Sequence, residues 1–297
     1  MKRRIVFAGC SFTWGQGLWS YWPNKDAHIP TAGDYVNNRC GIPDDAIRFR
    51  DEHRFPRLVC NKFGYCTPVV KRYNGSTDLV SIEFLEEVLK NNVTYDSHLT
   101  ENVNKDEITD VVFQFTNLFR SEFTFDYKGN TYQHFHDLYS KYSITNKLHF
   151  HKNGMIEVEE FSKGNNDILL EWLLDNNFTI DDFIEVHSKK LHTKVESTLK
   201  KFESLGANIH ITFMDDTHLE NIFKNDYLAS KIIKLKYNNE EYSTIMEMQN
   251  NYKDLVIATD DTFHFVDDDG HPSLKCHQII ADNIVEHIKK HEKKNYI

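Results

Sequence analysis

The stretch that decides the fold lies at the start of the chain and reads Ile5-Val6-Phe7-Ala8-Gly9-Cys10-Ser11-Phe12-Thr13. The run Arg4–Ala8 is mostly apolar and does not alternate with polar residues, which is typical of a parallel strand covered on both faces. Gly9 follows at once and favours a tight turn, because glycine adopts backbone angles that other residues avoid. Ser11 would therefore stand at the carboxyl end of a buried strand, where open α/β sheets bind their ligands.

Four more apolar runs predict strands of the same kind, and helical spacing of apolar residues fills the intervals between them. The expected strands are Cys66–Val70, Val111–Phe115, Asn208–Met214 and Leu255–Ala258. The expected helices are Thr77–Asn91, Asp182–Leu205 and a last helix from about Leu274. Strands that alternate with helices predict a parallel sheet joined by right-handed crossovers. We therefore predict an α/β fold, a three-layer sandwich with helices on both faces of the sheet.

Two stretches break this rhythm, and we interpret both as insertions on a single α/β domain that spans residues 1–297. Residues 118–180 contain two hairpin signals, Lys128-Gly129-Asn130 and Asn153-Gly154, each between runs of strand-forming residues. This stretch leaves the predicted core at the end of a strand, so we expect it to form a hairpin-rich cap over the candidate site. Residues 216–254 form a second insertion, which we expect to be irregular or helical.

The composition argues against several classes of protein. The chain carries 35 Lys and Arg against 45 Asp and Glu, a net charge of −10, whereas a general nucleic-acid binder needs a clustered cationic face. No apolar run reaches the length of a membrane span, and the apolar stretch before Gly9 is too short for a signal peptide. We therefore expect a cytoplasmic protein whose five cysteines are free thiols.

A second motif lies far along the chain, at Val266-Asp267-Asp268-Asp269-Gly270-His271-Pro272-Ser273. Asp268 and His271 are three residues apart in a turn-prone loop before the last predicted helix. This spacing lets the carboxylate accept a hydrogen bond from one imidazole nitrogen while the other nitrogen faces a nucleophile.

In their order along the chain, four segments resemble the sequence blocks of the SGNH (GDSL-like) serine hydrolase family. They are Gly9-Cys10-Ser11-Phe12-Thr13, Tyr73-Asn74-Gly75-Ser76-Thr77-Asp78, Phe115-Thr116-Asn117-Leu118 and Asp268-Asp269-Gly270-His271-Pro272-Ser273. Two positions depart from the family pattern. Cys10 stands where the family usually has aspartate, and Phe115 stands where it usually has glycine.

The resemblance implies a flavodoxin-like parallel sheet and a serine esterase that hydrolyses small carboxylic esters, with O-acetyl groups on a sugar or glycoconjugate as the first expectation. Ser11 would be the nucleophile, His271 the general base, and Asp268 the residue that orients His271. The oxyanion hole would consist of the backbone N–H groups of Ser11 and Gly75 and the side-chain amide of Asn117. This mechanism needs no cofactor and no metal, and we expect no nucleic-acid or membrane partner.

Other interpretations of the same residues stay open. Each motif taken alone has a structural explanation, and the chain could be a non-catalytic module of this fold that binds a glycan or a protein. An acyltransferase could use the same serine. Cys10 is a rival nucleophile, but adjacent residues leaving a strand point to opposite sides, so we expect its thiol to face the core.

Several histidines also occur at spacings that a metal ion could use. They are His134 and His136, His149 and His151, and the run Asp215-Asp216-Thr217-His218. Because the chain contains 16 histidines, some such spacings arise by chance, and we do not predict a metal site.

Overall fold

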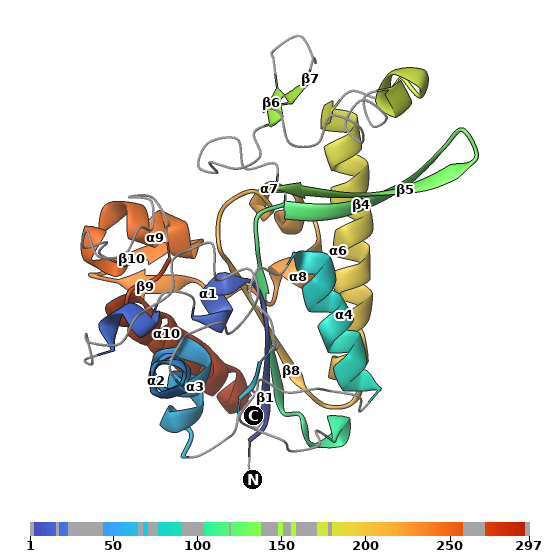
Figure 1. Ribbon diagram of the computed structural model, residues 1–297. Coiled ribbons are helices and arrows are strands. Elements are labelled where there is room, and N and C mark those ends of the chain that lie inside the picture. Colours follow the sequence, from blue (N-terminus) through green and yellow to red (C-terminus); the bar gives the residue numbers. More distant parts are fainter. Residues whose placement is uncertain are drawn as a thin grey trace.

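The computed structural model describes residues 3–15, 18–22, 44–64, 68–70, 77–90, 104–118, 120–137, 148–150, 156–158, 171–177, 180–257 and 271–294. At its centre is a four-stranded parallel sheet with the order β2-β1-β3-β8 (Figure 1). The strands are β1 (Ile5–Ala8), β2 (Val69–Val70), β3 (Asp110–Phe115) and β8 (Asn208–Phe213). If these four strands are counted in their order along the chain, their order across the sheet is 2-1-3-4. A flavodoxin-like sheet has the same order at its first four positions. The predicted α/β class with a parallel sheet is confirmed.

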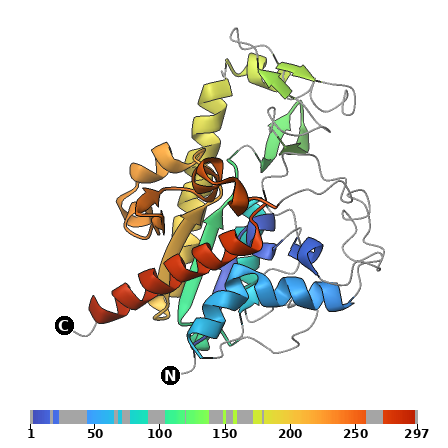
Figure 2. The same cartoon turned by 90° about the vertical axis from the view of Figure 1, so that its left-hand side faces the viewer.

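Side chains of the central strand alternate between two buried clusters, one on each face of the sheet. Ile5 and Phe7 join a cluster with α3 (Phe55–Lys62) and α10 (Leu274–Lys294). Val6 and Ala8 join a second cluster with helices from the other face, α4 (Asp78–Leu89) and α6 (Ile180–Ser204). Figures 1 and 2 show these helix pairs on opposite sides of the sheet. Both faces are covered, which explains why the strands read as continuous apolar runs.

The predicted helices form with ends close to those expected, and side chains cap two of them. The hydroxyl of Thr77 accepts a hydrogen bond from the backbone N–H of Val80 at 3.3 Å and caps α4. The Ser273 hydroxyl does the same for Cys276 at the start of α10. After α6, Gly206 has a φ of +93°, a left-handed conformation that commonly ends helices.

One predicted strand is wrong. Of the run Leu255–Ala258, Leu255 ends the short 3₁₀ helix η4 (Lys253–Leu255), and Val256 makes a single antiparallel bridge with Pro272. Residues 231–233 lie beside β8 instead, where the N–H of Ile211 donates to the carbonyl of Lys231 at 2.9 Å. Leu255 is fully buried in the core. Its apolar character therefore reflects a buried connection, which a short apolar run cannot distinguish from a strand.

The strands of both predicted hairpins pair in residues 118–180, while the predicted turn Asn153-Gly154 lies outside the described residues. Strand β4 (Arg120–Tyr127) pairs antiparallel with β5 (Asn130–Asp137), and β6 (Leu148–Phe150) pairs with β7 (Ile156–Val158). In the first turn Lys128 and Gly129 both have positive φ angles, 48° and 82°, as a two-residue hairpin turn of matching twist requires. The tip of this hairpin is tied to residues 171–175, because the Tyr127 hydroxyl bonds to the carboxylate of Asp175 at 2.7 Å.

The segment 216–254 consists of short elements that contribute to the main core. Leu235, Tyr242, Ile245 and Met248 belong to the same buried cluster as α10. The elements are α7 (Leu219–Phe223), α8 (Asp226–Ala229), β9 (Leu235–Tyr237), β10 (Glu240–Tyr242) and α9 (Ile245–Asn251). The described residues also form α1 (Ser11–Trp14), η1 (Leu18–Tyr21), α2 (Asp44–His53) and η3 (Lys105–Glu107). Within the described ranges, no helix combines the length and apolarity needed to cross a bilayer.

Candidate functional site

Ser11 begins α1, with two residues, Gly9 and Cys10, between it and the end of β1. The turn between them requires Gly9, because a Cβ at that position would lie 2.3 Å from the hydroxyl of Thr13 and 2.8 Å from the side chain of Gln114. Gln114 belongs to the neighbouring strand β3 and accepts a hydrogen bond from the Thr13 hydroxyl at 2.6 Å. The missing Cβ thus lets the turn that presents Ser11 lie directly against β3. The Ser11 side chain itself lies outside the described part of the structure.

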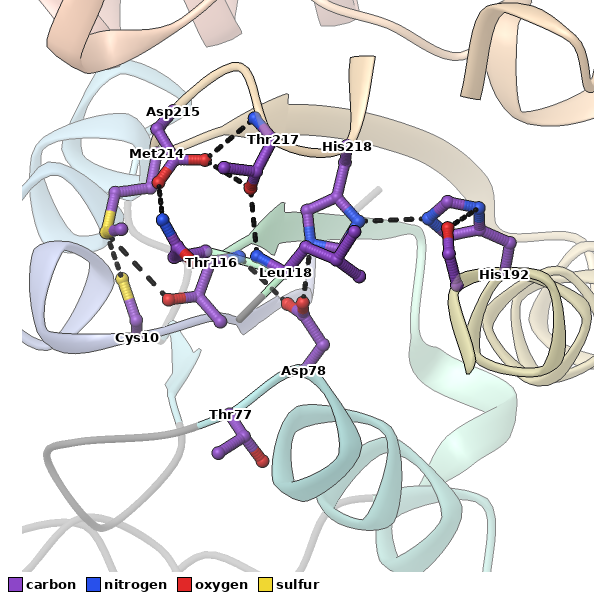
Figure 3. A network of polar contacts seen from close by, with 12 residues as sticks. Cys10, Thr77, Asp78, Thr116, Leu118, His192, Met214, Asp215, Thr217 and His218 are labelled. Atoms are coloured by element: carbon purple, nitrogen blue, oxygen red, sulfur yellow. Dashed lines mark hydrogen bonds and ion pairs between the residues drawn. The ribbon is translucent and has the colours of Figure 1, made fainter. Parts of the chain in front are cut away.

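Cys10 faces the core, as expected from its alternation with Ser11. Its side chain is only 1% exposed, and its sulfur lies 3.5 Å from Gln114 Oε1. The same sulfur lies 3.7 Å from the sulfur of Met214 (Figure 3). Cys60 and Cys276 are also free and buried, and burial raises the pKa of the Cys276 thiol well above its usual range. Cys40 and Cys66 lie outside the described residues. Cys10 therefore behaves as a core side chain in the place where the resemblance would have an aspartate.

Asn117 lies at the end of β3 in a closed ring of hydrogen bonds that joins the ends of β3 and β8. Its Nδ2 donates to Asp215 Oδ2 at 2.7 Å. Asp215 Oδ1 accepts from both the backbone N–H and the hydroxyl of Thr217, at 3.1 and 2.6 Å. The Thr217 oxygen in turn accepts from the N–H of Leu118 at 2.9 Å. Figure 3 shows these hydrogen bonds as dashed lines. Asn117 and Asp215 are both buried, so this ring fixes the exit of β3.

A second buried network meets the same exit from the α4 side of the sheet. Asp78 Oδ1 accepts a hydrogen bond from the backbone N–H of Thr116 at 2.8 Å. The other carboxylate oxygen of Asp78 lies 2.9 Å from His218 Nε2, although their alignment falls short of a hydrogen bond. His218 Nδ1 and His192 Nε2 are 2.9 Å apart. Burial, and then the neighbouring His218, lower the pKa of His192 to about 3, so His192 is neutral near pH 7.

The buried network continues from His192 to side chains of α6 and α7. The side-chain amide of Asn221 donates to the hydroxyl of Ser188 at 3.1 Å, and the Ser188 oxygen lies 3.4 Å from His192 Nδ1. The sequence gives little sign of this network, because His192 and Ser188 occupy a helix face that reads as ordinary core.

His271 lies beside the residue that follows Ser11. The centroids of the His271 and Phe12 rings are 5.3 Å apart, with planes tilted by 59°, and His271 is 7% exposed. Backbone pairing holds the segment in place, because the carbonyl of His271 accepts from Ile257 at 2.9 Å and the N–H of Ser273 donates to Leu255 at 2.9 Å. Residues 255–257, which the sequence predicted as a strand, therefore support His271, the candidate base.

The predicted site residues are described to different extents. Asn117 and His271 are described with their side chains and Ser11 through its backbone, whereas Gly75 and Asp268, with Asp267 and Asp269, lie outside the described residues. Their roles stay predictions.

Of the residues whose spacing could suit a metal ion, only some are described with their side chains. Asp215 and His218 belong to two different networks, the side chains of His134, His136 and His149 are not described, and His151 lies outside the described residues. In the part of the chain that is described, no three or more His, Cys, Asp or Glu side chains are arranged to hold a metal ion.

Comparison of the chain with protein-family models, with curated proteins and with solved structures finds no match in any of the three.

Proposed function

We propose that this protein is a serine esterase of the SGNH type that hydrolyses small carboxylic esters through an acyl-enzyme on Ser11. The contact between His271 and Phe12, with ring centroids 5.3 Å apart, is the observation that carries the proposal. It joins the first and the last of the four sequence blocks, which stand at opposite ends of the chain. A turn serine and a histidine are the two groups that acyl transfer needs first, and the ring contact supports a position of His271 near the turn that carries Ser11.

In the proposed reaction Ser11 Oγ bonds to the ester carbonyl carbon while its proton moves to His271. The electron pair of the carbonyl moves onto its oxygen, which becomes the oxyanion. The tetrahedral intermediate then expels the alcohol, which takes the proton from His271, and leaves the acyl group on Ser11. Water attacks the acyl-enzyme with His271 again as base and releases the carboxylic acid. Asp268 would orient His271 and stabilise the imidazolium.

The oxyanion would be held by the backbone N–H groups of Ser11 and Gly75 and by the side-chain amide of Asn117. Donors that are already oriented before the reaction stabilise such charge best, because they need no reorganisation when it develops. Asn117 meets this requirement, since it is 6% exposed and its amide is bound to Asp215. An amide nitrogen carries two hydrogens, so holding one with Asp215 is compatible with donating the other to substrate.

The substrate class follows from the resemblance alone: small esters, with O-acetyl groups on sugars or glycoconjugates first. In this proposal the hairpin segment 118–180 selects the substrate, because it leaves the core directly after Asn117. No cofactor takes part, and the partner is the ester substrate itself.

The test is labelling with a fluorophosphonate, together with a panel of esters of increasing acyl length. We expect the wild-type protein to be labelled and to hydrolyse short esters. Ser11→Ala should lose both properties, and the matched control Ser197→Ala, at an exposed position on α6, should keep both. A wild-type protein that is neither labelled nor active would favour the binding module. Labelling with acyl transfer to a sugar hydroxyl rather than to water would favour the acyltransferase.

A further inference from the structure

Three consecutive residues at the exit of β3 each donate a hydrogen bond to a side chain from another part of the chain. The N–H of Thr116 donates to Asp78, the side-chain amide of Asn117 donates to Asp215, and the N–H of Leu118 donates to Thr217. All three bonds are 2.7 to 2.9 Å long. A turn held at three successive positions by side-chain acceptors has little freedom left, which is the condition for a precisely placed donor.

From this arrangement we propose that Asp215 is a positioning residue, which fixes the Asn117 amide with its nitrogen rather than its oxygen directed for oxyanion binding. The proposal rests on the proposed function. A carboxylate accepts hydrogen bonds and donates none, so only the Nδ2 end of the amide can face Asp215. Without this partner the amide could turn over and present its carbonyl oxygen to the oxyanion, where two negative oxygens would repel each other.

Asp215 can set this orientation because its own carboxylate is fixed. Its Oδ1 accepts two hydrogen bonds from Thr217. The Thr217 hydroxyl already accepts from Leu118, so its one hydrogen must go to Asp215. The backbone N–H of Leu118 thus fixes the Thr217 hydroxyl, Thr217 fixes the Asp215 carboxylate, and Asp215 fixes the side-chain amide of Asn117. Asp215 is 7% exposed, which shields these bonds from competing water.

The neighbouring carboxylate supplies a matched control. Asp216 follows Asp215 directly but is exposed, and no side-chain contact of it is described. Asp215→Ala and Asp215→Asn are therefore compared with Asp216→Ala and Asp216→Asn, which make the same change of charge one residue away. Thermal unfolding of each variant separates loss of fold from loss of position, and Asp215→Asn keeps the size of the side chain if Asp215→Ala does not fold.

The first measurement is steady-state kinetics on a short ester. We expect Asp215→Ala to lower kcat about 10- to 100-fold, less than the loss of a whole oxyanion donor, with KM nearly unchanged. Asp216→Ala should leave both constants as they are. In an Asn117→Ala background, Asp215→Ala should cause almost no further loss, because the amide that it positions is already absent. Fully additive losses would overturn the positioning role, while Ser11→Ala, which tests the proposed function, would still be inactive.

The second measurement does not depend on catalysis. In protein labelled with ¹⁵N at asparagine, the side-chain amide signal of Asn117 is assigned by its absence in Asn117→Ala. We expect one of its two hydrogens to resonate downfield and exchange slowly in wild type and in Asp216→Asn, and to lose both properties in Asp215→Ala. An Asn117 signal that is unchanged in Asp215→Ala would overturn the proposal even if the protein hydrolysed no ester at all.

Discussion

A buried aspartate lies beside a histidine at both ends of the central sheet, but the two pairs have different surroundings. At the amino end, Asp110 Oδ1 lies 3.1 Å from His210 Nε2, and its other oxygen lies 3.0 Å from Arg3. Burial alone would raise the pKa of Asp110, yet hydrogen bonding and charge from His210, with help from Thr109 and Arg3, hold it below its usual value. This pair is a closed ionic cluster between neighbouring strands.

At the carboxyl end, Asp78 lies 2.9 Å from His218 but also accepts the N–H of Thr116. Within the described segments, no arginine or lysine lies within ion-pair distance of Asp78. One oxygen of Asp78 accepts a hydrogen bond from the turn that carries Asn117. His218, the other member of the pair, contacts His192. The comparison teaches that the same two residue types secure strand ends at one end of the sheet and shape a turn at the other. Changes at the two ends should accordingly separate activity from stability.

The largest effect is expected at the carboxyl end from Ser11→Ala. Loss of the nucleophile should reduce ester hydrolysis by about 10⁴-fold or more, while the thermal unfolding midpoint stays close to that of wild type, because the substitution removes a single hydroxyl group. Initial rates on a short acetyl ester measure the effect. Turnover retained in this variant would show that another group performs the chemistry.

Asn117→Ala should have the next largest effect on activity. Losing one oxyanion donor lowers kcat by about 10²- to 10³-fold, with KM little changed because the bond forms fully only in the transition state. Steady-state kinetics on the same ester provide the check. A change confined to KM would mean that Asn117 binds the ground state and is not part of the oxyanion hole.

Asp110→Ala should show the reverse pattern at the amino end. It leaves the buried His210 and Arg3 without their carboxylate, and breaking such a pair costs about 3–5 kcal/mol in the free energy of unfolding. Urea unfolding measures the loss, and kcat of the folded variant should match wild type. Asp106→Ala, at an exposed position in η3, is the control and should change neither quantity. A lower kcat in folded Asp110→Ala would contradict the separation of the two ends.

The two ends should also respond to different ranges of pH. Burial lowers the pKa of both His192 and His277 to about 3, whereas an unfolded histidine titrates near 6.5. Below pH 6.5 the unfolded chain binds protons that the folded chain does not, so stability is full above that pH and falls progressively toward pH 3. The pKa of Asp110 is lowered in the folded protein. Its contribution to stability is therefore lost only when the pH falls below about 3.9, where an unfolded aspartate takes up its proton. Urea midpoints between pH 8 and 5 should decline with acidity.

His277→Gln sharpens this test. The Gln oxygen can replace His277 Nδ1 as acceptor for the N–H of Phe55, a bond of 3.1 Å, while the titratable group is gone. The decline of the urea midpoint with acidity should then become shallower. An unchanged slope would show that His277 does not contribute to it.

The smallest effect is expected from replacing residues 120–170 with a short Gly/Ser linker, which keeps Asn117 and Leu118 in place. Hydrolysis of a small acetyl ester should continue at nearly the wild-type rate, while kcat/KM for a larger preferred ester falls. Equal losses on both esters in a folded variant would mean that the hairpin segment supports the catalytic geometry itself.

Much of the fold could be predicted from the sequence because the strands of the parallel sheet are covered on both faces and the helices that cover it pack an apolar side against it. The turn at Lys128 and Gly129 was predictable for a similar reason, since its backbone angles are encoded locally. The edge of the sheet was not. Leu255 and Ile233 are both apolar and buried, and nothing in their local pattern tells which of their segments lies beside β8.

Some residues of the candidate site could likewise be predicted from the sequence, and others could not. Ser11, Asn117 and His271 stood out because each belongs to a short motif next to a predicted strand or helix. Asp215 stood out as part of a possible metal group and as a residue that follows a core strand, but not as a partner of Asn117, and His192 did not stand out at all. Their partners, Asn117 and His218, come from distant parts of the chain. A contact of this kind depends on how the strand ends and helices are placed in space, which residue spacing along one segment does not contain.

The central position of β1 has a consequence for how the chain folds. Val6 pairs with Val69 on one side and with Val111 on the other, so the first strand has no partner until much later parts of the chain are available. Contacts so distant in sequence slow folding, because long loops must close first. Phe12 shares its buried cluster with Cys276 and Ile280 of α10. We therefore expect the turn at Ser11 to gain its final surroundings only when α10 docks, so that the candidate site is complete no earlier than the core around it.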